Sequence, residues 1–155
     1  MPATKQNEPL LRVLQPLWSK YETDGPRNWC TDTAAWVWDQ LKRTARHTAA
    51  SAEIVGYHLE DNPTATVGAV EGGHDFLLLG GRYIVDFWQK EVWDSEHPLL
   101  LDVIDDFEQV CRLYGNPHHW EPYGIRGELL CRKRLLRNIN QKGISNGLHA
   151  ADRSE

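Results

Sequence analysis

A pair of short apolar runs joined by two glycines constrains the fold of this chain more than any other feature. The runs are Phe76–Leu79 and Tyr83–Phe87, and a Gly-Gly pair lies between them. Short apolar runs on either side of glycines are typical of a β-hairpin. His74 opens the first run and Asp86 lies near the end of the second. The hairpin therefore brings an imidazole and a carboxylate onto neighbouring strands.

The register of this hairpin decides whether the two groups can meet, because a shift of one residue moves a side chain to the other face of the sheet. A two-residue Gly-Gly turn places His74 and Asp86 on opposite faces. A three-residue turn over residues 79–81 places His74 directly across from Asp86, and Asp75 then faces away. Gly81 can supply the left-handed residue that such a turn needs, so we predict this second register. Facing Cβ atoms are then about 4.5–5.5 Å apart, close enough for a hydrogen bond.

A cysteine at the predicted start of a helix supplies a third reactive group. Apolar side chains follow it at helical spacing: Ala34, Val37, Trp38, Leu41 and Ala45. Asn28 is the predicted N-cap and Asp32 suits the first turn. Cys30 then lies at the positive end of the helix dipole, which favours the thiolate, although the carboxylate of Asp32 opposes this effect.

A thiol, an imidazole and a carboxylate together are the parts of an activated nucleophile. We predict that Cys30 attacks a carbonyl, that His74 is the general acid and base, and that Asp86 orients the imidazole. The predicted oxyanion donors are the backbone N–H of Cys30 and the side chain of Asn28. Trp29 either lines a substrate groove or belongs to the core.

Less reactive interpretations of the same residues stay open. Free cysteine is among the most buried residue types, so Cys30 can be an inert core residue. His74 can simply lie at the edge of a strand. Asp86 can face solvent or pair with Arg82 instead of His74. A carboxylate in an apolar strand nevertheless needs a partner, and His74 is the nearest one in the predicted register.

The composition limits the class of protein. The chain has 155 residues, of which 41% are hydrophobic and 25% charged, as in one soluble globular domain. The net charge of −5 argues against nucleic-acid binding. No run approaches the ~20 apolar residues of a membrane span. The N-terminus has no apolar signal region, so we expect a cytoplasmic protein or one exported without a cleavable signal peptide.

Neither a cofactor nor a metal is expected. The three cysteines are widely spaced: Cys30, Cys111 and Cys131. Without a C-x-x-C pair they indicate neither a disulfide scaffold nor a zinc ribbon. His118 and His119, taken with Cys111 or His97, match no metal-binding motif, and no glycine pattern for nucleotide binding is present.

The remaining periodicity predicts a single domain over residues 1–140 and a flexible tail over 141–155. The predicted elements are helices over 9–21, 98–114 and 127–140, strands over 51–60 and 65–70, an extension of the sheet over 88–93, and a loop over 115–124. Pro16 is expected to weaken the first helix.

The arrangement resembles the papain-like cysteine hydrolase superfamily in its broad sense. That group includes peptidases, transglutaminase-like proteins, arylamine N-acetyltransferases and bacterial effector deamidases. Its members share a cysteine at a helix start, a histidine on a strand, and an Asp or Asn on the next strand. Here the pattern is similar over Asn28–Asp32, Gly73–Leu78 and Tyr83–Asp86, and the resemblance covers about residues 28–90.

The resemblance implies an α+β fold in which the cysteine helix packs on an antiparallel sheet bearing the histidine and the aspartate. It also implies a thiol hydrolase or transferase that acts on an amide bond of a peptide, a protein or a small amide. Asp24 stands where a papain-type oxyanion glutamine would be, and neither G-Q-C-W nor R-G-G-x-C occurs. Three functions therefore remain open: a cysteine peptidase or amidase, a glutamine deamidase or transglutaminase, and a non-catalytic binding or immunity-type protein.

Overall fold

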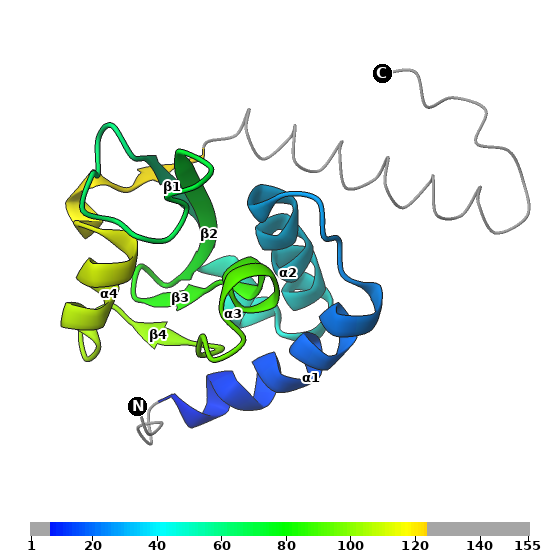
Figure 1. Ribbon diagram of the computed structural model, residues 1–155. Helices are drawn as coiled ribbons and strands as arrows, with labels where there is room; N and C mark the ends of the chain where they lie inside the picture. The colour runs from blue at the N-terminus through cyan, green and yellow to red at the C-terminus, as the bar shows by residue number, and fades with distance from the viewer. Residues whose placement is uncertain (1–6, 124–155) are drawn as a thin grey trace, which may run out of the picture.

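The computed structural model describes residues 7–123, which form a five-stranded antiparallel sheet with helices on both faces (Figure 1). The elements in chain order are α1 (Glu8–Asp24), α2 (Cys30–Thr44), α3 (Arg46–Ala50), β1 (Ala52–His58), β2 (Gly73–Leu79), β3 (Tyr83–Val85), the π-helix η1 (Gln89–Trp93), β4 (Leu101–Asp102), α4 (Phe107–Tyr114), the 3-10 helix η2 (Pro117–His119) and β5 (Glu121–Pro122). The predicted α+β class is therefore confirmed.

The strand order is β4-β3-β2-β1-β5, so β2 lies at the centre of the sheet. Its seven residues pair with all of β1, from Ala52 opposite Leu79 to His58 opposite Gly73. On its other side, β2 pairs with the shorter β3. The strand that carries His74 is thus held on both sides, and this fixes its backbone.

The predicted hairpin register is wrong by two residues. Leu79 pairs with Tyr83, and the turn consists of Gly80, Gly81 and Arg82. Both glycines have positive φ, 58° and 68°, a conformation that glycine adopts without steric penalty. Leu79, predicted to lie in the turn, is instead buried within the ladder, where its apolar side chain is removed from water.

The two faces of the sheet pack against different helices. On one face, Ile54, Leu77 and Val85 belong to a core shared with α1 and α2. On the other face, Phe76 and Ile84 belong to a core shared with α4. Figure 1 shows the sheet between α1 and α2 on one side and α4 on the other. Successive residues of each central strand alternate between these two cores, as the pleat requires.

The helix predicted at the N-terminus is present and continues through Pro16 to Asp24. The strand predicted over 51–60 is present as β1. The strand predicted over 65–70 is wrong, because these residues form turns in which the N–H groups of Thr66 and Val67 donate to the Leu113 carbonyl.

Two other predictions fail near Asp86 and Asp102. Residues 88–93 do not extend the sheet, because Asp86 accepts a hydrogen bond from the Gln89 N–H and the chain turns into η1. The helix predicted over 98–114 is divided into β4 and α4. Arg82 binds the buried carboxylate of Asp102 at 2.9 and 2.8 Å and so secures β4 beside β3.

The loop predicted over 115–124 contains η2 and the two-residue strand β5. The helix predicted over 127–140 and the tail predicted over 141–155 lie outside the described residues. Among residues 7–123, no helix combines the length and the apolar character that crossing a membrane requires.

Candidate active site

The contact predicted between His74 and Asp86 is present. His74 is the second residue of β2, and Asp86 directly follows the last residue of β3. The imidazole Nε2 lies 2.7 Å from the Asp86 Oδ2, and each side chain is only 2% exposed. Because the register differs from the predicted one by an even number of residues, both groups still face the same side of the sheet. They meet diagonally, not directly across the ladder.

Asp86 is held by three donors. Its Oδ2 accepts from His74 and, at 2.7 Å, from the hydroxyl of Tyr114. Its Oδ1 accepts from the backbone N–H of Gln89 at 3.1 Å. A buried carboxylate is tolerated only when hydrogen bonds replace its lost hydration. These contacts fix the carboxylate's orientation as well as its charge.

Cys30 is the first residue of α2 and is partly buried. The Cys30 side chain is among the groups that raise the pKa of His74, which places the sulfur close to the imidazole. Because Nε2 is committed to Asp86, Nδ1 is the ring nitrogen available to the sulfur. The structure thus brings together the three side chains that the sequence singled out.

The first turn of α2 contacts both faces of β2. While Cys30 reaches His74, the hydroxyl of Thr31 donates to the Asp75 Oδ2 at 2.7 Å. Asp75 faces away from His74, as predicted, because neighbouring residues of a strand alternate in direction. The hydrogen bond from Thr31 therefore anchors the helix start to the strand directly beside the Cys30 thiol.

The electrostatics of the site favour an ion pair. Burial alone would lower the pKa of His74, but the charge and hydrogen bond of Asp86, with the contact to Cys30, raise it to about 10. Burial alone would raise the pKa of Asp86, but the charge and hydrogen bond of His74 hold it below its ordinary value. At neutral pH the pair is an imidazolium beside a carboxylate. A cation next to a thiol favours the thiolate.

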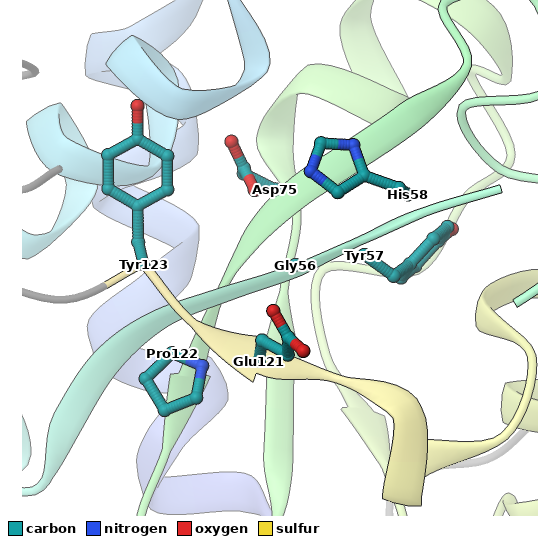
Figure 2. A pocket seen from close by; sticks show the side chains of 7 residues that line it. All are labelled: Gly56, Tyr57, His58, Asp75, Glu121, Pro122 and Tyr123. Carbon is teal, nitrogen blue, oxygen red and sulfur yellow. The ribbon is translucent and has the colours of Figure 1, made fainter. Parts of the chain in front are cut away.

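A hollow of about 280 Å³ opens on the Asp75 side of the strand (Figure 2). Glu121 and Asp75 each lie across from Gly56 in the sheet, so the three residues form one row over β5, β1 and β2. The Asp75 carboxylate lies over Gly56, where any larger residue would place its Cβ, so glycine is required at the centre of this row. In Figure 2, Tyr123 and His58 are seen on either side of the Asp75 carboxylate. The hydrogen bond of Asp75 to Thr31 places this hollow beside the start of α2.

Asn28 is not the helix cap that was predicted, and of the two interpretations of Trp29 the core one is wrong. The N-cap of α2 is Trp29, in an extended conformation and with no side-chain capping hydrogen bond, and not Asn28. Trp29 is 59% exposed, so it is not a core residue. The first backbone hydrogen bond of the helix runs from Thr33 N–H to the Trp29 carbonyl. The N–H of Cys30 precedes that bond and remains the predicted oxyanion donor; the role of Asn28 stays a prediction.

Sequence reasoning missed Thr31, His97 and Tyr114. Thr31 follows the cysteine directly, and a short hydroxyl side chain in a first helical turn is a signal for such an anchor. His97 and Tyr114 are contributed by segments that are distant in sequence from the hairpin. Tyr114 is the last residue of the helix predicted over 98–114, and periodicity alone does not distinguish a core tyrosine from one that donates to a carboxylate.

Among residues 7–123, no group of three or more His, Cys, Asp or Glu side chains is placed to hold a metal ion. Comparison of the chain with known proteins gives no match to a family model, to a curated protein or to a solved structure.

Proposed function

We propose that this protein is a thiol hydrolase or acyl transferase of papain-like architecture that acts on an amide bond. Its nucleophile is Cys30, its general acid and base is His74, and Asp86 orients the imidazole. One observation supports this proposal above the others. The buried imidazole of His74 lies 2.7 Å from the Asp86 carboxylate, and the Cys30 side chain is close enough to the ring to raise the pKa of His74.

In the first step the Cys30 thiolate attacks the amide carbonyl carbon, and a carbon–sulfur bond forms. The negative charge that develops on the carbonyl oxygen is stabilised by the Cys30 N–H at the helix start. The His74 imidazolium then gives its Nδ1 proton to the departing nitrogen as the carbon–nitrogen bond breaks. The products of this step are a thioester on Cys30, a free amine and a neutral imidazole.

In the second step the neutral imidazole removes a proton from an incoming nucleophile. Water gives a carboxylic acid, whereas an amine gives a new amide. In either case the carbon–sulfur bond breaks and the thiolate is restored beside the imidazolium. Asp86 remains ionised throughout and keeps the same ring nitrogen, Nε2, occupied, so that Nδ1 alone exchanges protons with the reacting groups.

The hollow beside α2 is the place where we expect part of the substrate to bind. It is adjacent to Thr31 and therefore to the nucleophile. The exposed ring of Trp29, next to Cys30 in the chain, is a second surface against which a peptide or a small amide can pack.

The thiol's reactivity tests the proposal without knowledge of the substrate. Purified protein is treated with limiting iodoacetamide between pH 5 and 9, and alkylation of each cysteine is followed by peptide mass spectrometry. Cys111, a free and partly buried thiol of α4, is the internal reference. We expect Cys30 to react at pH 6, where an ordinary thiol with a pKa near ~8.5 is almost unreactive. Replacement of His74 by Ala should remove this reactivity.

Activity is then sought with a panel of acylated fluorogenic amines and, separately, by ammonia release from glutamine peptides. Cys30→Ala should abolish any turnover, and Cys111→Ala should leave it unchanged. Equal alkylation of the two cysteines at pH 6, or full turnover by Cys30→Ala, would refute the proposed function. Which substrate releases its amine distinguishes a peptidase or amidase from a deamidase.

A further inference from the structure

The hydrogen-bonded chain at the site does not end at Asp86. The Tyr114 hydroxyl lies 2.7 Å from the Asp86 Oδ2 and 3.0 Å from the Nε2 of His97. Tyr114 is fully buried and His97 is 2% exposed. These two residues lie 28 and 11 positions after Asp86, on the last turn of α4 and in the segment before β4. Three separate parts of the chain therefore converge on one carboxylate.

The proton positions in this chain follow from the chemistry of its members. An ionised carboxylate can only accept, so the Tyr114 hydroxyl donates to Asp86. The same hydroxyl has one proton, so its oxygen accepts from His97, which must carry its proton on Nε2. The His97 N–H and the Tyr114 O–H are thus both directed along the chain toward Asp86. Burial lowers the pKa of His97, which keeps the ring neutral and able to hold this tautomer.

Tyr114 is fixed by contacts that are independent of the carboxylate. Its carbonyl oxygen accepts hydrogen bonds from the Asn62 Nδ2 at 3.0 Å and the Trp120 Nε1 at 2.9 Å. Its ring packs against Phe76, with centroids 4.8 Å apart. The hydroxyl is therefore placed by the surrounding fold and does not follow Asp86. A donor held in this way can impose an orientation on the group that accepts from it.

We propose that Tyr114 is a positioning residue for Asp86 and that His97 fixes the direction of the Tyr114 hydroxyl. The inference rests on the proposed function. The hydroxyl shares Oδ2 with the imidazole, so it holds the oxygen that orients His74. It also makes that oxygen less basic, which keeps the Nε2 proton on the ring of His74 and leaves Nδ1 to exchange protons with the substrate.

The other titratable groups around this pair come from the sheet and from η1. His74 and Tyr57 lie on the neighbouring strands, and the ring centroids of His74 and Tyr114 are 6.3 Å apart. Lys90 donates to the His97 carbonyl at 2.8 Å, and the His97 N–H donates to the Asp94 carbonyl at 2.9 Å. A pH profile of the site contains contributions from these groups, so the test depends on matched variants.

Tyr57→Phe is a matched control for Tyr114→Phe. The Tyr57 hydroxyl is also buried and donates a short hydrogen bond, 2.6 Å to the Val67 carbonyl, but it does not contact Asp86. Both substitutions remove one buried hydroxyl bond. We expect Tyr114→Phe to slow Cys30 alkylation at pH 6 about tenfold, the lower end of what a hydrogen bond to a charged group contributes. Tyr57→Phe, which leaves every hydrogen bond of Asp86 in place, should slow alkylation far less than Tyr114→Phe.

A second pair of variants tests His97. Leu at this position removes the donor to Tyr114, whereas Gln offers an N–H in its place. His97→Leu should move the alkylation profile in the same direction as Tyr114→Phe, and His97→Gln should restore most of the wild-type rate. If Tyr114→Phe does not fold, this pair decides the question.

Three outcomes are distinguishable. Slower alkylation in Tyr114→Phe and His97→Leu alone supports the inference. Identical profiles for wild type, Tyr114→Phe and His97→Leu overturn it while the proposed function stands. A wild-type Cys30 that does not react at pH 6 overturns both.

Discussion

The ion pair of His74 with Asp86 makes folding stability depend on pH in a defined direction. The folded-state pKa of His74 is about 10, because Asp86 and Cys30 outweigh the effect of burial, whereas the ordinary value is 6.5. The folded protein therefore holds a proton that the unfolded chain releases between these two values. The stability contributed by this group is fully present below about pH 6.5 and is lost as the pH rises through about 10.

The size of the effect follows from the two pKa values. Their difference, from 6.5 to about 10, is about 3.5, and at ~1.4 kcal/mol for each pH unit this gives an upper limit of roughly 5 kcal/mol. Asp86 acts at the acid end, because its lowered pKa makes stability fall as the pH drops below about 4. The pair should therefore stabilise the protein most between about pH 4 and 6.5.

Asp86→Asn removes the largest contribution that raises the pKa of His74, so this pKa should fall to about its ordinary value of 6.5, since burial opposes the remaining effect of Cys30. Above pH 7 the ring is then neutral in both states, and the contribution of His74 no longer changes with pH. We expect the wild type to lose several kcal/mol relative to Asp86→Asn between pH 6.5 and 9.5. The measurement is urea denaturation followed by tryptophan fluorescence, for which the chain has seven tryptophans.

Asp102→Asn is the matched control, because Asp102 is also a fully buried carboxylate but its partner, Arg82, keeps its charge throughout this range. Its difference from wild type should be large and the same at every pH. A constant difference between Asp86→Asn and wild type from pH 6.5 to 9.5 would show that His74 is not held as an imidazolium, and the reasoning would fail.

Two further substitutions test the surroundings of the thiol. Thr31→Val removes the hydroxyl that donates to Asp75, so the helix start should lose its anchor. Cys30 alkylation at pH 6 should slow, and the free energy of unfolding should fall by about 1–3 kcal/mol. Thr31→Ser, which keeps the hydroxyl, should behave like wild type in both measurements. Glu121→Gln changes the lining of the hollow without touching the proposed catalytic groups, so the KM of any substrate identified should rise while kcat is retained. Glu108→Gln, an exposed substitution on α4, is its control, and equal KM values for the two variants would place the substrate elsewhere.

The sequence predicted the parts of the site better than their exact arrangement. His74 and Cys30 were placed on the correct elements, and Asp86 directly after its strand, because strand alternation and helical spacing are strong local signals. The register was wrong because a Gly-Gly pair is compatible with several turns, and the choice depended on the burial of Leu79. The predicted contact of His74 with Asp86 is nevertheless present, because a register shift by two residues keeps every side chain on the same face of the sheet.

Long-range contacts explain what the sequence did not predict. Residues 98–114 contain helical spacing throughout, yet Arg82 binds Asp102 and divides them into a strand and a helix. That division lets Tyr114 reach Asp86 and lets His97 reach the Tyr114 hydroxyl. No local pattern encodes such a convergence, because its cause is tertiary packing.

The start of α2 interacts with two consecutive residues of β2 whose side chains point in opposite directions. Cys30 lies beside His74, and Thr31 donates a hydrogen bond to Asp75. The first turn of α2 thus straddles the strand, and a translation or rotation of the helix relative to the strand would disrupt both interactions together. Reactivity of the sulfur should consequently report on the docking of a single helical turn. A mild denaturant concentration that loosens this turn should slow the alkylation of Cys30 while the sheet is still intact.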